Sequence, residues 1–215
     1  MFVDVSHVIE EGMTTYPGLP GPQLSDHLSR EDSRARYDPG TEFHIGRIEM
    51  VANTGTYLDT PFHRFDAGFD LTGLPLDLVA DLAGVCVSVE ERAIPPESLG
   101  SLDIAGRAVL FATGWDEFWR TERYGDSDHP FVTSETAEAL VNGGAALVGI
   151  DSVNIDDTTG GTRPAHTTLL DAGIPIVEHL TGLDRLVGVS FRFFGVPPKV
   201  KGLGTFPVRA FAILT

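Results

Sequence analysis

Residues 133–150, TSETAEALVNGGAALVGI, contain the helix–strand unit that decides the fold class. Thr133 or Ser134 can cap a helix, because their hydroxyls accept hydrogen bonds from backbone N–H groups of the first turn. Gly143-Gly144 ends that helix, and the apolar run Ala145–Ile150 follows at once as a buried strand. A helix that leads directly into an apolar strand is typical of proteins that mix the two elements around one sheet.

Working outward, six further short runs rich in Val, Ile, Leu and Ala have the length and composition of strands. They are Arg47–Ala52, Val85–Val89, Ala108–Ala112, Ile174–Val177, Leu186–Val189 and Arg209–Leu214. Short helices are predicted at Thr167–Ala172 and Leu74–Asp81, and loops at 17–40 and 118–130. The sequence thus predicts one α/β (α+β) domain over residues 1–215, with a central mixed sheet and flanking helices.

The charge balance excludes several classes of partner. The 215 residues include 15 Lys and Arg against 31 Asp and Glu, for a formal charge of −16. Nucleic acids and anionic membrane surfaces are therefore not expected as partners. The single cysteine, Cys86, lies in an apolar run and allows no disulfide or cysteine-based zinc site. With no apolar stretch long enough to span a membrane and no signal-like start, we expect a soluble, cytoplasmic protein.

The first group of reactive side chains is Asn53-Thr54-Gly55-Thr56-Tyr57-Leu58-Asp59-Thr60-Pro61-Phe62-His63, just after a predicted strand. Loops at strand ends are where a rigid scaffold presents functional groups. Gly55 permits a tight turn here, and Pro61 rules out the interior of an ordinary helix. A surface turn capped by Asp59 is the alternative interpretation.

The second group follows strand Ala145–Ile150 and reads Asp151-Ser152-Val153-Asn154-Ile155-Asp156-Asp157. It continues to His166, before a short predicted helix, and to Glu178, after a short predicted strand. A carboxylate at a strand end and an imidazole at a helix start can converge on one cleft, where they would suit Zn²⁺ or Mn²⁺. A histidine that merely caps the helix is the alternative.

Together the two groups resemble the cyclase-type metal-dependent hydrolases, a family that includes bacterial kynurenine formamidases (arylformamidases) and isatin hydrolase. That family carries His-x-Gly-Thr-His-x-Asp-x-Pro-x-His, followed by His-x11-Glu. His166 and Glu178 match the second element. Further matching blocks occur along nearly the whole chain: Asp4-Val5-Ser6-His7, Tyr16-Pro17-Gly18, Ala112-Thr113-Gly114-Trp115, Gly149-Ile150-Asp151-Ser152 and Pro207-Val208-Arg209-Ala210. The resemblance implies the swivelling β/β/α fold and a homo-oligomer, dimer or tetramer.

The first element departs from the family pattern, because Asn53 and Tyr57 stand where the family places two metal-binding histidines. By resemblance, Asp59, His166 and Glu178 are metal ligands and His63 is the catalytic proton shuttle. Amide and phenol oxygens are poor substitutes for imidazole. We therefore expect one divalent metal (Zn²⁺ or Mn²⁺), or none, in place of a binuclear site, and no nucleotide cofactor.

Several other side chains are candidates for the same cleft. Glu49 and His44 are considered as replacement ligands, and His7 as a residue that lines the cleft or makes a structural hydrogen bond. Tyr16 is the predicted substrate-binding aromatic, by resemblance, with packing of a loop as the alternative. Trp115, Phe118 and Trp119 are interpreted as loop packing. His27, His129 and His179 are interpreted as surface residues.

Three functions follow from this pattern. The first is hydrolysis of an amide, lactam or lactone of a small metabolite at a single metal held by Asp59, His166 and Glu178, with Tyr57 donating to the oxyanion. The second is a metal-independent acid–base cyclase, dehydratase or isomerase that uses His63, Asp59, Tyr57 and Glu178. The third is a non-catalytic protein that binds a small ligand on the same scaffold.

Overall fold

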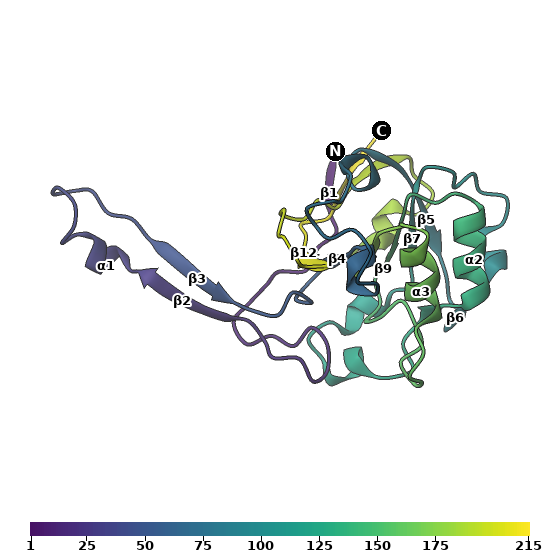
Figure 1. Cartoon of the computed structure of the whole chain (residues 1–215), viewed down its shortest axis with the longest axis horizontal. Helices are drawn as coiled ribbons and strands as arrows, with labels where there is room; N and C mark the ends of the chain where they lie inside the picture. Colours follow the sequence, from purple (N-terminus) through teal and green to yellow (C-terminus); the bar gives the residue numbers. More distant parts are fainter.

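The computed structural model describes residues 1–215 as a body built on one mixed sheet, from which a long hairpin arm projects (Figure 1). Nine strands form the sheet, in the order β1 (Phe2–Asp4), β13 (Phe211–Leu214), β11 (Phe191–Phe194), β5 (Leu82–Ser88), β7 (Ala108–Ala112), β9 (Leu147–Ile150), β10 (Ile176–Glu178), β4 (Tyr57–Asp59) and β12 (Thr205–Pro207). The central strands β5, β7, β9 and β10 run parallel, and the outer ones pair antiparallel. The predicted mixed fold is confirmed.

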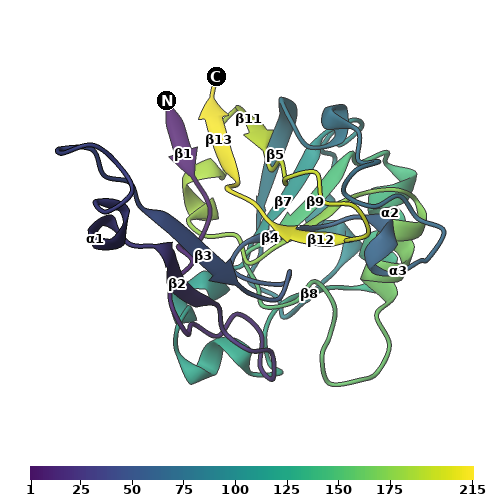
Figure 2. The ribbon, with the colours of Figure 1, turned by 60° about the vertical axis from the view of Figure 1, so that its left-hand side comes forward.

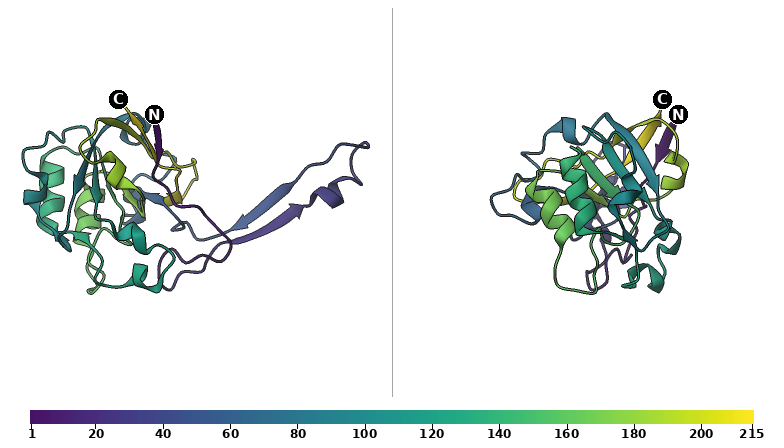
Figure 3. Two further views of the ribbon diagram at one scale, coloured as in Figure 1. Left: turned by 180° about the vertical axis from the view of Figure 1, so that it is seen from behind. Right: turned by 90° about the vertical axis from the view of Figure 1, so that its right-hand side faces the viewer.

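Both faces of this sheet are buried. One face packs against α2 (Ser134–Asn142) and α3 (Pro164–Asp171), which lie side by side in front of the strands in the right-hand view of Figure 3. The other face packs against the loops around Leu71 and Leu183. Because the central strands are covered on both faces, they are continuous apolar runs, and this is the pattern that made them recognisable in the sequence.

The helix predicted within residues 133–150 forms as expected and is α2. Thr133 is its N-cap, with Oγ1 accepting from the Thr136 N–H at 3.2 Å, and Gly143 is its C-cap. Helix α3 begins earlier than predicted, at Pro164, since proline is favoured in the first turn of a helix. His166 therefore lies inside the first turn of α3 and not before it. Its place in the helix fixes the direction in which the His166 side chain points.

The arm is the largest departure from the predicted fold. Residues predicted as a loop at 17–40 form β2 (Gln23–Leu28) and α1 (Arg30–Ser33), and β2 pairs antiparallel with β3 (Ile45–Glu49). The predicted strand at 47–52 is thus wrong in its boundaries, because the chain leaves the ribbon after Glu49 to enter the body. Figure 2 shows the ribbon standing clear of the sheet.

The remaining differences have local causes. The predicted strand Leu186–Val189 is wrong: Leu183–Leu186 forms a turn of 3₁₀ helix, and Gly188 at φ 72° breaks the extended path before β11. The predicted helix Leu74–Asp81 is a single 3₁₀ turn at Leu76–Leu78, because the chain turns at Asp81 (φ 56°) into β5. Residues 118–130 form a loop, as predicted, apart from one 3₁₀ turn.

The other short elements are β6 (Ala93–Ile94), β8 (Phe131–Val132), and 3₁₀ turns at Pro61–His63, Pro96–Leu99, Trp115–Phe118 and Glu122–Gly125.

None of the helices is both long enough and apolar enough to cross a membrane.

Asp151, at the end of β9, ties two loops to the sheet. Its buried carboxylate accepts hydrogen bonds from the Thr113 N–H at 2.9 Å, the Thr113 hydroxyl at 2.5 Å and the Gly114 N–H at 3.0 Å. We expect Asp151→Asn to lower the free energy of unfolding by about 2–4 kcal/mol, because its NH₂ group would face donors. Denaturant unfolding measures this. Asp66→Asn, on the surface, is the control. If Asp151→Asn is as stable as the wild type, Asp151 does not tie the two loops to the sheet.

Candidate active site

The register of β4 places the candidate residues on one face of the sheet. Tyr57 lies opposite Glu178 of β10, and Asp59 lies opposite Thr205 of β12. Residues two apart on a strand point to the same face, and directly opposed residues on antiparallel strands share a face. Segments separated by more than 100 residues in the sequence therefore meet around this three-residue strand.

Asp59 has one oxygen occupied and one without a partner. Its side chain is fully buried, and Oδ1 accepts a hydrogen bond from the Thr205 hydroxyl. Oδ2 is buried with no hydrogen-bond partner. A carboxylate oxygen in that state costs free energy unless a cation or a donor reaches it. The unpartnered oxygen points to a ligand that completes the site.

His166 is held by its Nδ1 and presents Nε2 to the site. Nδ1 lies 2.6 Å from Asp156 Oδ2, while Nε2 lies 3.8 Å from Asp59 Oδ2 and 3.6 Å from Glu178 Oε1. Asp156 also accepts from the backbone N–H groups of Ala165 and His166, at 2.7 and 3.0 Å. A carboxylate behind an imidazole is the usual support of a metal-binding histidine, because it fixes the ring and raises its basicity.

Negative charge exceeds positive charge in this buried cluster. Burial disfavours the charged imidazole, yet Glu178, Asp156 and Asp59 together raise the pKa of His166 to about 10. Burial also raises the pKa of Glu178. Three buried carboxylates around one imidazole need a positive charge between them, either as a proton or as a bound cation. The donor set, two carboxylates and one imidazole, fits Zn²⁺ or Mn²⁺.

His63 lies at the solvent side of the same cluster. Its side chain is 36% exposed, and Nδ1 lies 2.8 Å from the Thr205 hydroxyl and 3.6 Å from Asp59 Oδ1. Ligand atoms of Asp59, His63 and His166 all lie within 4.8 Å of one another. His63 is thus close enough to serve as a ligand, and exposed enough to exchange protons with solvent.

Tyr57 belongs to a buried chain of hydrogen bonds. Its hydroxyl lies 2.7 Å from Glu178 Oε2 and 3.3 Å from His179 Nε2, and His179 Nδ1 lies 2.8 Å from the Tyr124 hydroxyl. Burial lowers the pKa of His179 to about 3, so its ring is neutral. With one N–H available, the consistent pattern is Tyr124 to His179, His179 to Tyr57, and Tyr57 to Glu178. The Tyr57 proton is therefore directed at Glu178.

A pocket of about 300 Å³ opens onto this cluster. It is lined by Tyr16, Leu19, Asn53, Tyr57, His63, Arg64, Asn154, Arg163, His166 and Glu178. The structure thus brings together the predicted residues Tyr16, Asn53, Tyr57, His63, His166 and Glu178, with Asp59 buried behind them. Tyr16 also packs against the cluster of Trp115, Tyr124 and Val153.

The two replacement ligands considered from the sequence do not reach the pocket. His44 and Glu49 lie on the exposed arm, where His44 contacts Asp26 at 2.7 Å and Glu49 contacts Arg47 at 3.3 Å. Glu49 is the last residue of β3, so the strand does not continue to Asn53 and gives the two side chains no common face.

Two histidines interpreted as surface residues are in fact fully buried. His129 hydrogen-bonds to Ser152 and Thr158, and His179 completes the chain described above. His179 has a left-handed backbone (φ 56°), which turns its ring back under β4. His7 stacks on Trp119, with ring centroids 3.9 Å apart, and it is not among the residues that line the pocket. Its Nε2 is buried without a partner, so this nitrogen does not make the structural hydrogen bond considered from the sequence.

Other residues of the site were not identified from the sequence. Thr205 aligns both Asp59 and His63, but it lies far along the chain, just outside the matching block Pro207-Val208-Arg209-Ala210. Arg64 and Arg163 were also missed, although each lies within three residues of a predicted site histidine, and that proximity was the available signal.

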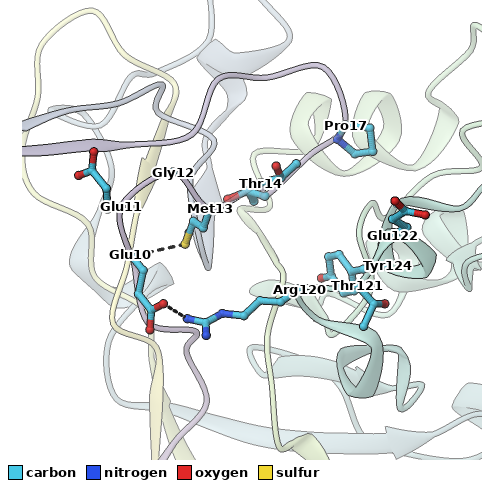
Figure 4. A pocket seen from close by; sticks show the side chains of 12 residues that line it. Glu10, Glu11, Gly12, Met13, Thr14, Pro17, Arg120, Thr121, Glu122 and Tyr124 are labelled. Carbon is cyan, nitrogen blue, oxygen red and sulfur yellow. Dashed lines mark hydrogen bonds and ion pairs between the residues drawn. The ribbon is translucent and has the colours of Figure 1, made fainter.

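A larger cavity, of about 570 Å³, lies elsewhere, between residues 10–17 and 120–125. Figure 4 shows Glu10 and Arg120 ion-paired at its edge, and its lining holds none of the buried carboxylates of the cluster. Its size does not make it the active site, because it lacks a catalytic or metal-binding constellation.

Comparison with known proteins shows relatives along nearly the whole chain. The family described as "Putative cyclase" matches residues 3–157. A kynurenine formamidase of Salinibacter ruber is 29% identical over 214 residues, covering 97% of this chain and 95% of that protein. The structure of a predicted metal-dependent hydrolase from Bacillus stearothermophilus is 28% identical with a TM-score of 0.77, covering 99% and 97% of the two chains.

Isatin hydrolase A from Labrenzia aggregata, solved with benzyl benzoate, superposes with a TM-score of 0.80 at 20% identity, covering 99% of this chain and 93% of that one. At that identity the likeness supports the fold alone.

Proposed function

Because the chain belongs to the cyclase family, we propose that it is an arylformamidase-like hydrolase that cleaves an amide bond of a small aromatic metabolite at one divalent cation. The observation that carries the proposal is the buried, unpartnered Oδ2 of Asp59, 3.8 Å from His166 Nε2. Kynurenine formamidases among the relatives make N-formylkynurenine the first substrate to test.

Asp59, His166 and Glu178 would hold the cation, Zn²⁺ or Mn²⁺. We prefer Glu178 to His63 as the third ligand because Glu178 is 1% exposed and its Oε1 lies 3.6 Å from His166 Nε2. Three protein ligands leave a coordination position open for substrate or water. A cation in such a site supplies Lewis-acid chemistry, polarising a carbonyl and making water more acidic.

The residues of this chain would handle protons and orientation. His63, anchored through Nδ1 to Thr205, keeps Nε2 free to take a proton from the attacking water and to deliver it to the leaving nitrogen. Tyr57 donates to Glu178, so we propose that it orients this carboxylate and does not act as the oxyanion donor expected from the sequence. Tyr16, at the pocket wall, would pack on an aromatic substrate.

Metal analysis of purified protein tests the ligand set. We expect about one Zn²⁺ or Mn²⁺ per chain, lost in Asp59→Asn, His166→Gln and Glu178→Gln. His63→Gln should keep the metal and lose about 10²–10⁴-fold in kcat, since it removes proton transfer only. Circular dichroism checks that each variant is folded.

Different results would contradict these assignments. Loss of metal from His63→Gln, with retention in Glu178→Gln, would make His63 the third ligand. If the metal-free protein retains full catalytic activity, the side chains act without a metal, and this would favour an acid–base cyclase, dehydratase or isomerase. Failure of broad amide and lactone screening, together with thermal stabilisation by a small ligand, would favour a non-catalytic binding protein.

Asn53 and Tyr57 explain why we propose one metal and not two. Neither side chain is a good ligand for Zn²⁺, and the Tyr57 hydroxyl is already engaged with Glu178. The double variant Asn53→His/Tyr57→His should bind a second equivalent of metal, measured by elemental analysis of the dialysed protein. His27→Asn, on the arm, controls for the general effect of altering a side chain. A stoichiometry that stays at one would contradict this explanation.

We also propose that the protein is a homo-oligomer in which a second copy covers the arm. An isolated two-stranded ribbon is marginally stable in water, yet this one exposes Leu24 (43%) and Ile48 (59%) directly opposite each other. Tyr37 and Phe43 pack together near its tip and are likewise exposed. None of these four side chains belongs to a hydrophobic cluster of the body.

Light scattering after size exclusion tests the arm. The wild-type chain should have a mass of at least twice 23.1 kDa, and Leu24→Asp/Ile48→Asp should be monomeric. Ser25→Ala/Arg47→Ala alters the opposed pair next to it on the same strands and should leave the mass unchanged. A monomeric wild type, or a double aspartate variant that keeps its mass, would contradict the proposal.

A further inference from the structure

Arg64 and Arg163 bring positive charge to a pocket in an otherwise acidic protein. Both line the pocket that opens onto His63, His166 and Glu178. The chain as a whole carries a formal charge of −16, so it repels anions at long range. Two guanidinium groups at the candidate active site therefore call for a specific explanation.

Neither arginine has a carboxylate oxygen within 4.0 Å, whereas eight of the thirteen arginines of the chain do. Eight arginines have a carboxylate oxygen within 4.0 Å: Arg34, Arg47, Arg92, Arg107, Arg120, Arg123, Arg192 and Arg209. Arg120 at the larger cavity is among them, paired with Glu10 (Figure 4). Arg30, Arg36 and Arg185 also lack such a partner, but Arg64 and Arg163 are the two that line this pocket.

Arg163 is held in place by backbone carbonyls alone. Its Nη1 donates to the carbonyl oxygens of Asp157, Gly160 and Thr162, at 3.3, 2.9 and 2.7 Å. These contacts fix the guanidinium without neutralising it, and they leave Nη2 and Nε free to donate. A pre-positioned guanidinium loses little conformational freedom when it binds a planar anion.

Arg64 lines the same pocket from the segment that carries His63. It directly follows His63, and its Nε lies 3.4 Å from the Thr167 hydroxyl of α3. Its guanidinium lies 5.4 Å from the centre of the Phe65 ring, so an aromatic face supports the charged group. The two arginines thus come from the elements that carry the two site histidines.

We infer that Arg64 and Arg163 select substrates with a carboxylate group set apart from the scissile bond. Guanidinium and carboxylate form paired, charge-assisted hydrogen bonds, and the pocket of about 300 Å³ leaves room for a small anion beside an aromatic amide. The inference rests on the proposed amide hydrolysis, and it adds the two residues of this chain that would recognise a remote carboxylate on the substrate. Arg64 and Arg163 bind the remote anion, while His63 and the buried cluster act at the amide.

The test compares two aryl formamides that differ only in charge, 3-(2-formamidophenyl)propanoate and its primary amide. For the wild type, kcat/KM should favour the acid by about 10- to 100-fold, mainly through KM. Arg64→Gln/Arg163→Gln should reduce this ratio to about 1, because kcat/KM for the acid falls much further than kcat/KM for the primary amide. Arg64→Lys/Arg163→Lys should restore part of the preference, and Arg209→Gln, which removes one surface charge, should keep all of it.

Binding of the amine products separates this inference from the proposed function. If neither formamide is hydrolysed, calorimetry with 3-(2-aminophenyl)propanoate and its amide decides the question: tighter binding of the acid that depends on both arginines supports anion selection in a protein that is not a formamidase. Equal handling of acid and amide by the wild type overturns the inference. An acid preference that survives in the double Gln variant, or that Arg209→Gln abolishes, overturns it as well.

Discussion

The excess of buried negative charge around His166 is the constraint on which the site depends. Asp59, Asp156 and Glu178 are each at most 1% exposed, and His166 is the basic group that faces all three. Such a cluster is costly to bury unless its members are hydrogen-bonded and its charge is offset. The structure meets the first condition with backbone N–H groups, Thr205 and Tyr57. The second condition explains why we place a cation there.

The sheet supplies the rigidity that this cluster needs. β4 has three residues, and two of them, Tyr57 and Asp59, face the site. Pairing with β10 on one side and β12 on the other fixes their direction, and a shift of one residue would turn both away from the pocket. The parallel strands β9 and β10 hold the same edge against α3, so His166 is positioned by the same core.

Much of the fold was predictable because its central strands are buried on both faces and are therefore continuous apolar runs. β7 was located to the residue, and α2 was identified from its caps, because strands buried on both faces and capped helices have strong local signals. β1, β4 and β12 were not predicted, since three-residue strands owe their pairing to neighbours distant in sequence. For the arm, the sequence predicts a loop in place of β2 and a strand with shifted bounds in place of β3, because both strands face solvent on both sides and show no apolar alternation.

By itself, the sequence determined the fold class, the family resemblance and the residue types available for chemistry: Asp59, His63, His166 and Glu178 were named from motif and spacing. Only the tertiary structure decided their partners. It placed His129 and His179 in the interior, directed the Tyr57 hydroxyl to Glu178, and left Arg64 and Arg163 without counterions beside the pocket. The reason is physical: motifs report which groups lie near one another along the chain, whereas burial, pairing and unbalanced charge depend on contacts between strands far apart in sequence.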